Sequence, residues 1–281
     1  MASSSKPAHL DPSELGTKEY WDKLYTTELT NHAANPSDTG TNWFDDSDAE
    51  GRIVAFLDAL TEDDQDVLEK PLSKEDAALM DLGCGNGELL FALRDDGWEG
   101  QMLGVDYSAQ SVALAKRIGE TRDAQEEEEE AEQGDQKEGE AEKTPSVRFL
   151  EWDLLAGPIS PNDASSPLSF APSQETLFDI ILDKGTFDAI SLSAGLSSDE
   201  NTNPCETYRK RLLQLLNPNG GVFLVTSCNW TEPELRSWFE EDEDGELSVV
   251  GRVEYPTFTF GGVKGQTITT LCFRRGVVGS E

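Results

Sequence analysis

Short apolar runs alternate with segments of helical periodicity along most of the chain. Apolar residues recur at helical spacing in residues 88–94, in the segment that follows Ser108 and in residues 207–216, and residues 232–239 also look helical. Five short runs are mainly apolar and do not alternate with polar residues: residues 77–82, 102–105, 147–150, 178–182 and 222–226. Strands of this kind are buried on both faces, so the pattern predicts an α/β fold with a mostly parallel sheet covered by helices on both sides.

The last part of the chain has a different pattern. Residues 249–255 and 267–273 are rich in strand-forming residues and are separated by Gly261 and Gly262. We expect these two segments to form a C-terminal antiparallel hairpin.

Two segments interrupt the alternation. Residues 125–142 contain ten acidic residues, one lysine and no aromatic residue, so they cannot bury enough apolar surface to offset the entropy cost of ordering. We expect a disordered acidic insert there, and a surface loop at residues 157–174, where four prolines occur among serine and asparagine. Strand patterns resume after each segment, so we assign both to one domain of residues 47–281, preceded by an N-terminal arm of residues 1–46.

The composition narrows the class of partner. The chain has 56 acidic and 22 basic residues, a formal net charge of −34, which disfavours binding to nucleic acid or an anionic membrane and favours a basic partner. It has no run near the ~18 apolar residues of a membrane span, a polar start without a secretory signal, and four scattered cysteines that fit reduced thiols. With only two histidines, a metal site is not expected. We predict a monomeric, cytoplasmic protein.

The clearest chemical pattern is a glycine-rich loop after the first strand, Asp81-Leu82-Gly83-Cys84-Gly85-Asn86-Gly87. Gly83 and Gly85 permit positive φ and a close approach of the backbone to a ligand. Glu88 breaks the dinucleotide pattern GxGxxG, and no phosphate-loop motif occurs. Three later strands also end near an aspartate: Asp106, Asp153 and Asp183. In a parallel sheet these ends share the edge where ligands bind, although each aspartate alone could simply cap a turn.

Residues 81–87, together with Asp106 and Asp153, resemble the motifs of the class I, seven-β-strand S-adenosylmethionine-dependent methyltransferases. The resemblance covers roughly residues 79–273 apart from the two interruptions. It implies a Rossmann-like, seven-stranded sheet and S-adenosyl-L-methionine as the cofactor. It also implies that Asp106 accepts the ribose hydroxyls, that Asp153 and the backbone of Leu154 contact the adenine, and that the loop of Asp81, Gly83 and Gly85 meets the methionine portion.

The segment Asp183-Lys184-Gly185-Thr186-Phe187-Asp188-Ala189 resembles protein-lysine methyltransferases that act on elongation factor 1-alpha. Residues 13–25, 40–44 and 227–231 are similar to one branch of that family, found in fungi and animals. Thr41 departs from the acidic residue usual in this branch. The resemblance implies a protein-lysine N-methyltransferase whose acceptor is a lysine of translation elongation factor 1-alpha, a basic protein that an acidic enzyme would attract.

Aromatic residues suggest how the site is covered. Trp21 lies in a predicted helix of residues 17–28, whose aromatic stripe either packs on the sheet or closes over the cofactor; we include Trp21 in the predicted cofactor group. Trp230 follows the fifth strand, where the acceptor should enter. It either lines a pocket for the lysine stem and its cationic product or belongs to the core.

Methyl transfer to lysine requires a neutral amine, whereas free lysine has a pKa of ~10.4. The predicted catalytic residues are Asp183, Asn229 and Trp230. Asp183 either orients the ammonium and accepts its proton or only stabilises a turn, and Asn229 offers a neutral amide that holds the amine without raising its pKa. Two alternatives remain: a small-molecule methyltransferase on the same fold, and a catalytically silent acidic domain that binds partners.

Overall fold

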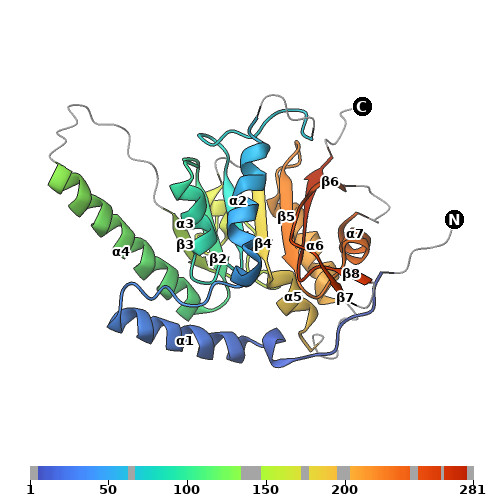
Figure 1. The fold of residues 1–281 in the computed structure, drawn as a ribbon, viewed down its shortest axis with the longest axis horizontal. Coiled ribbons are helices and arrows are strands. Elements are labelled where there is room, and N and C mark those ends of the chain that lie inside the picture. The colour runs from blue at the N-terminus through green and yellow to red at the C-terminus, as the bar shows by residue number, and fades with distance from the viewer. Residues whose placement is uncertain are drawn as a thin grey trace.

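A seven-stranded sheet forms the centre of the computed structural model, with the strand order β3-β2-β1-β4-β5-β9-β6 (Figure 1). The structure describes residues 6–62, 67–133, 147–171, 177–194, 203–240, 246–260 and 263–276. The strands are β1 (Leu79–Leu82), β2 (Met102–Asp106), β3 (Arg148–Glu151), β4 (Ile180–Lys184), β5 (Val222–Ser227), β6 (Leu247–Val253) and β9 (Thr269–Arg275). All neighbouring strands pair in parallel except β9, which is antiparallel to β5 and β6. The predicted fold class is confirmed, including the antiparallel C-terminal pair.

Helices cover both faces of the sheet. The helices are α1 (Lys18–Ala34), α2 (Ala49–Ala59), α3 (Glu88–Asp95), α4 (Ala109–Gln133), α5 (Thr186–Ser191), α6 (Pro204–Leu215) and α7 (Glu232–Phe239). One buried cluster joins α5, α6 and α7 to the sheet through residues such as Phe187, Tyr208 and Phe239, and a second joins α2, α3 and α4 through Leu57, Leu90 and others. Short 3-10 helices occur at η1 (Glu14–Gly16), η2 (Asp45–Ser47) and η3 (Pro167–Phe170), and a small hairpin at β7 (Phe258–Phe260) and β8 (Val263–Gly265).

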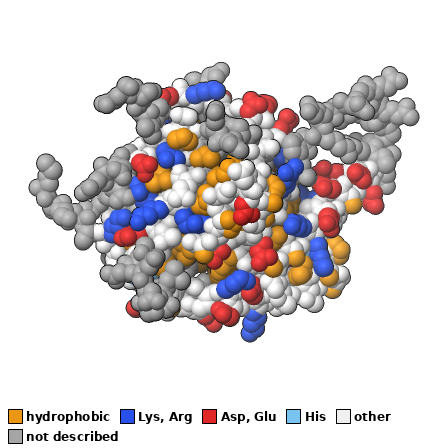
Figure 2. Space-filling view, turned by 180° about the vertical axis from the view of Figure 1, so that it is seen from behind, with side chains coloured by type: hydrophobic (Ala, Val, Ile, Leu, Met, Phe, Trp, Pro, Cys, Tyr) orange, Lys and Arg blue, Asp and Glu red, His pale blue; other side chains and the backbone are white. Residues whose placement is uncertain are grey.

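The acidic segment differs from its prediction. Helix α4 continues to Gln133, so residues 125–133 are helical where disorder was expected, because glutamate, glutamine and alanine are good helix formers even without a core to pack on. The side chains of residues 123–129 are exposed, and acidic side chains gather near this end of the helix (Figure 2). Residues 134–142 lie outside the described residues. The predicted loop at residues 157–174 is largely irregular through residue 171 and includes η3; residues 172–174 are not described.

The N-terminal arm is fastened to the sheet edge at which the parallel strands end. The Asn86 side chain donates a hydrogen bond to the carbonyl of Thr39 at 2.9 Å, and Lys184 donates to Asn42 Oδ1 at 2.9 Å. The backbone N–H of Ser13 donates to a carbonyl at the end of α5 at 3.0 Å. In Figure 1, α1 runs along this edge of the sheet. The arm therefore covers the place where a ligand of this fold would bind. Among the described helices, none combines the length and apolar character needed to cross a membrane.

Candidate active site

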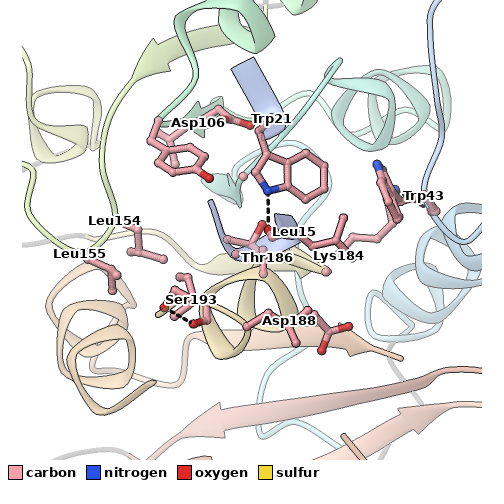
Figure 3. A pocket seen from close by; sticks show the side chains of 18 of the residues that line it. Leu15, Trp21, Trp43, Asp106, Leu154, Leu155, Lys184, Thr186, Asp188 and Ser193 are labelled. Atoms are coloured by element: carbon pink, nitrogen blue, oxygen red, sulfur yellow. Dashed lines mark hydrogen bonds between the residues drawn. The ribbon is translucent and has the colours of Figure 1, made fainter. Parts of the chain in front are cut away.

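A cavity of about 220 Å³ lies at this edge, between the arm and the ends of β1, β2 and β4 (Figure 3). Six of the predicted site residues line it: Trp21, Gly83, Asp106, Asp153, Leu154 and Asn229. Four others, all described, are not part of its lining: Asp81, Gly85, Asp183 and Trp230. The wall is mainly apolar and aromatic, with contributions from the arm, from the strand ends and from α5.

The glycine loop is shaped by close packing. Gly83 and Gly85 have φ values of +66° and +56°, a region that side chains with a Cβ rarely adopt. A Cβ at Gly83 would lie 2.0 Å from Thr186 Oγ1, and a Cβ at Gly85 would lie 2.7 Å from the Tyr25 hydroxyl oxygen. Glycine at these positions lets the loop fit between α5 and α1. As a result, Gly83 forms part of the cavity wall while Gly85 lies behind it.

Asp106 presents a buried acceptor to the cavity. Its side chain follows β2 and is 6% exposed. One carboxylate oxygen accepts the backbone N–H of Gly85 at 3.2 Å and the other that of Ser108 at 2.8 Å. These bonds fix the carboxylate, and each oxygen keeps lone-pair capacity for a further donor. Burial raises the pKa of Asp106 to about 6, so the group is ionised at neutral pH.

The loop after β3 is organised by its own aspartate. Asp153 is exposed, and its Oδ1 accepts the backbone N–H groups of Leu155 at 2.7 Å and Ala156 at 3.1 Å. Leu154 is buried and lines the cavity. The second carboxylate oxygen of Asp153 remains available as an acceptor at the rim of this wall.

Arg211 on α6 is a supporting residue that the sequence analysis missed. Its guanidinium donates to the carbonyls of Leu154 and Gly157 and lies 5.3 Å from the centre of the Trp152 ring. These contacts hold the loop after β3 against the sheet. Because Arg211 is 57 positions from Leu154 and belongs to no recognisable motif, only the tertiary structure reveals the link.

Asp81 lies behind the glycine loop rather than in the cavity wall. It is 3% exposed, and its burial raises its pKa to about 8, an effect that the positive charge of Lys184 partly offsets. Lys184 lines the cavity, yet its ammonium donates to Asn42 Oδ1 and, at 3.0 Å, to the carbonyl of Trp43. The lysine therefore anchors the arm, and the carboxyl of Asp81, which is not part of the cavity wall, is mostly protonated at neutral pH.

Asp183 occupies a structural position. It is 2% exposed and accepts the backbone N–H groups of Thr186 at 2.8 Å and Phe187 at 2.9 Å, as well as the hydroxyl of Tyr208 at 2.6 Å. Its carboxylate thereby caps the first turn of α5. The geometry favours the turn-stabilising alternative over the predicted contact with the acceptor.

Trp230 belongs to the core. Its side chain is 3% exposed, its indole N–H donates to Ser191 Oγ at 2.9 Å, and its ring packs edge-on against Trp238 with 5.8 Å between centroids. A buried indole needs such a hydrogen-bond partner. The structure therefore supports the core alternative and does not place Trp230 against the acceptor.

Asn229 and Asp188 line the side of the cavity formed by α5 and the loop after β5. Asn229, a predicted catalytic residue, is exposed in that loop. Asp188, which the sequence analysis noted only as part of a motif, projects from α5 into the same wall. Its carboxylate accepts the hydroxyl of Ser227 and the backbone N–H of Cys228, the latter at 2.8 Å. Burial raises its pKa.

The arm contributes an aromatic cover. Trp21 donates its indole N–H to the carbonyl of Leu15 at 2.7 Å (Figure 3). Its ring stacks on Tyr25 with 6.2 Å between centroids and lies 5.4 Å from the ring of Trp43. These three rings all line the cavity. Two rings of the aromatic stripe of α1, Trp21 and Tyr25, therefore face the cavity.

Known proteins resemble this chain over nearly its full length. A methyltransferase-domain family matches residues 53–259. Protein-lysine N-methyltransferase EFM4 of Saccharomyces cerevisiae is 36% identical over 266 residues, which cover 95% of this chain and 96% of that protein. EFM4 of Schizosaccharomyces pombe is 34% identical, with 94% and 95% covered. The human protein EEF1A lysine methyltransferase 2 is 31% identical, with 94% and 88% covered.

Fold, cavity and matched domain together define a class I, S-adenosylmethionine-dependent methyltransferase. Within this class, the chain belongs to the protein-lysine N-methyltransferase family that these relatives represent. The predictions of family, enzyme class and cofactor are confirmed. The cavity also suits S-adenosyl-L-methionine physically. The backbone at Gly83 has no side chain in the wall, the buried carboxylate of Asp106 can accept hydrogen bonds from hydroxyl groups, and Leu154 provides an apolar wall.

Proposed function

We propose that this enzyme methylates the side-chain amine of a lysine in translation elongation factor 1-alpha. The observation that carries the proposal is the similarity to EFM4 and EEF1A lysine methyltransferase 2 over at least 94% of this chain. A similarity of this extent spans the arm as well as the sheet, and the arm supplies part of the cavity wall.

The residues proposed to hold the cofactor surround one end of the cavity. Asp106 would accept the ribose hydroxyls with its remaining lone pairs, and the Gly83 backbone would meet the methionine portion. The free oxygen of Asp153 and the backbone of Leu154 would contact the adenine, and Trp21 would cover the bound molecule. The cofactor supplies an electrophilic methyl group on a positively charged sulfur. Gly85 and Asp81 would support the loop from behind the cavity wall without touching the cofactor.

The arm and the loop after β5 are proposed to receive the acceptor. The rings of Trp43 and Phe44 line the cavity and suit the methylene stem of lysine and its cationic product. Closure by these rings would exclude water from the transfer. Asn229 would hold the amine through a neutral amide, whereas Asp183 and Trp230 would support α5 and the loop from beneath.

The charge of the enzyme suits a basic protein partner. A formal net charge of −34 would accelerate encounter with a basic acceptor, and the rate would fall as ionic strength rises. Cytoplasmic location and a monomeric state remain predictions that accompany this proposal.

Labelled methyl transfer tests the proposal directly. Purified enzyme and methyl-labelled S-adenosylmethionine are added to purified elongation factor 1-alpha and, separately, to a lysate that lacks the enzyme. Mass spectrometry then locates the label. We expect methyllysine in elongation factor 1-alpha as the main labelled product. The Asp106→Ala variant serves as the control and should lose most of the label at limiting cofactor.

Three other outcomes would change the proposal. Cofactor binding without any labelled protein would favour the small-molecule methyltransferase. Absence of both cofactor binding and label would favour the catalytically silent binding domain. A single labelled protein other than elongation factor 1-alpha would retain the reaction and change the acceptor.

A further inference from the structure

The cavity contains one carboxylate on its acceptor side. Among its described lining residues the carboxylates are Asp106, Asp153 and Asp188. Asp106 and Asp153 follow β2 and β3, where the adenosine of the cofactor is proposed to bind. Asp188 lies on α5, beside the loop that carries Asn229, and Figure 3 shows Asp188 and Asp106 on opposite sides of the cavity, with Thr186 between them.

Asp188 is held firmly without being neutralised. The Ser227 hydroxyl and the Cys228 N–H each donate to a different carboxylate oxygen, so each oxygen keeps capacity for another donor. The residue is only 5% exposed. A carboxylate in this setting is oriented by fixed donors and shielded from bulk water, which suits a group that exchanges a proton with a bound amine.

The groups around Asp188 do not compete for this proton. From the β5 side it faces the hydroxyl of Ser227, the thiol of Cys228 and the backbone of Asn229. Burial and the Asp188 charge raise the pKa of the Cys228 thiol to about 12, so this thiol stays protonated. From β4 it faces the charge of Asp183, whose oxygens already accept three donors and which lies outside the cavity wall.

We propose that Asp188 accepts a proton from the acceptor ammonium and thereby produces the neutral amine that is methylated. This inference rests on the proposed function and assigns to Asp188 the role that the sequence suggested for Asp183. An N–H bond of the ammonium breaks, an O–H bond forms on Asp188, and the electron pair remains on nitrogen. That pair forms the new N–C bond while the C–S bond of the methyl donor breaks and leaves its electrons on sulfur. Asp188 later releases the proton to solvent.

Burial strengthens this role. The raised pKa of Asp188 makes its carboxylate a better proton acceptor than an exposed one, while the aromatic walls lower the pKa of a lysine that enters. Both changes reduce the cost of moving the proton from nitrogen to oxygen.

The Asp188→Asn variant tests the proposal through its pH profile. General-base removal should lower kcat/KM for elongation factor 1-alpha by about 100- to 1,000-fold near pH 7. The deficit should shrink to below about tenfold near pH 9.5, because solvent then deprotonates a growing share of a lysine with a pKa of ~10.4. Asp188→Glu keeps a carboxylate and should retain the wild-type shape of the profile at reduced rate.

Ser227→Ala is the matched control, since it removes one support of the carboxylate and leaves the carboxylate itself. It should keep the shape of the wild-type pH profile, with the acidic limb moved to higher pH, because the Ser227 hydrogen bond lowers the pKa of Asp188. Calorimetry gives two readouts without turnover: the affinity for S-adenosylmethionine should be unchanged in Asp188→Asn, whereas the affinity of the S-adenosylhomocysteine-loaded variant for elongation factor 1-alpha should fall at pH 7. A deficit of equal size at every pH would overturn the proposal and leave Asp188 as a purely structural tie between α5 and the loop after β5.

The experiments test the proposed acceptor protein and the proposed role of Asp188 separately. If the lysate experiment labels a different protein, elongation factor 1-alpha is refuted as the substrate. The same pH comparison with the labelled protein then tests the role of Asp188. If no protein is labelled, both the proposed function and the role of Asp188 are refuted.

Discussion

The two ends of the cavity are built in different ways. The end proposed to hold the cofactor consists of strand termini and tight turns: the loop with Gly83, the end of β2 at Asp106 and the turn at Asp153. The end proposed to receive the lysine consists of side chains from α5 and from the loop after β5, with Asp188 and Asn229 in the wall and Asp183 and Trp230 beneath it. Turns depend on residues that are adjacent in sequence, whereas the acceptor wall depends on how two separate elements meet.

This difference explains which parts of the cavity leave a recognisable pattern in the sequence. At the cofactor end, positive φ, short glycine spacing and a strand-terminal carboxylate each leave a local pattern. At the acceptor end, Asp183 and Asp188 stand five residues apart in one motif, and only their direction distinguishes them. One caps α5 with its carboxylate, while the other reaches the cavity.

The largest expected effect is at the cofactor end, in Gly83→Ala. The added methyl group would lie 2.0 Å from Thr186 Oγ1, which donates to the carbonyl of Leu82 at 2.7 Å. Overpacking and the positive φ together should cost about 2–5 kcal/mol and abolish measurable cofactor binding. Gly97→Ala is the control, because it has a φ of +88° and no atom within 4 Å of the added Cβ; it should cost about 1–2 kcal/mol. Urea unfolding measures the free energy of unfolding of both variants. An equal loss in Gly83→Ala and Gly97→Ala would show that the contact between the added Cβ and Thr186 plays no part.

Asp106→Ala should weaken S-adenosylmethionine binding by about 1.5–3 kcal/mol, or about 10- to 150-fold in Kd, since a charge-assisted acceptor is lost. The ionised form of Asp106 is the one proposed to accept the ribose hydroxyls, and the pKa of Asp106 is about 6. Wild-type affinity should therefore fall as the pH drops below about 6, and this dependence should be absent in the variant. Calorimetry from pH 5 to 8 measures both effects, with unfolding curves as a check on folding. Unchanged affinity in the variant would remove Asp106 from the site.

Asp183→Asn should lower the free energy of unfolding by about 1–3 kcal/mol in mild acid. The reason is that one of the buried N–H or O–H groups that donate to the Asp183 carboxyl loses its acceptor oxygen. Burial raises the pKa of Asp183 to about 7, so folding favours the protonated carboxyl. The stabilisation from this carboxyl is present below the ordinary pKa of about 3.9 and is lost as the pH rises through 7. The deficit of the variant should therefore shrink between pH 5 and pH 8 in denaturant unfolding. A deficit that grows with pH would contradict this assignment.

The smallest effect is expected far from both ends, on deletion of residues 125–142. The described side chains at residues 125–129 are exposed on the outer part of α4. Their loss should change stability by less than about 0.5 kcal/mol and leave cofactor affinity unchanged. Thermal unfolding and calorimetry of the deletion variant measure both. A large fall in Tm would show that this acidic segment packs against the domain.

Some features of this protein follow from the sequence alone. Apolar runs, helical periodicity and the final glycine-separated strands predict the sheet, because burial on both faces leaves a continuous apolar pattern. The glycine loop and Asp106 are likewise readable, since a turn of positive φ and a strand-terminal carboxylate need particular residues at fixed short spacing. Helical continuation of α4 was missed because acidic composition disfavours a core but does not disfavour a helix.

Only the tertiary structure determined which of the candidate side chains line the cavity. Asp183 and Trp230 contact donors and rings within the core, whereas Asp188 lines the cavity. Arg211 holds the loop after β3, and Lys184 holds the N-terminal arm. Such choices depend on partners that are distant in the chain, and a buried polar group turns toward whichever donor or acceptor the packed elements provide. The sequence determined the glycine loop and the strand-terminal carboxylate at Asp106; the packing of α5 against β5 and the arm determined which side chains line the opposite wall of the cavity.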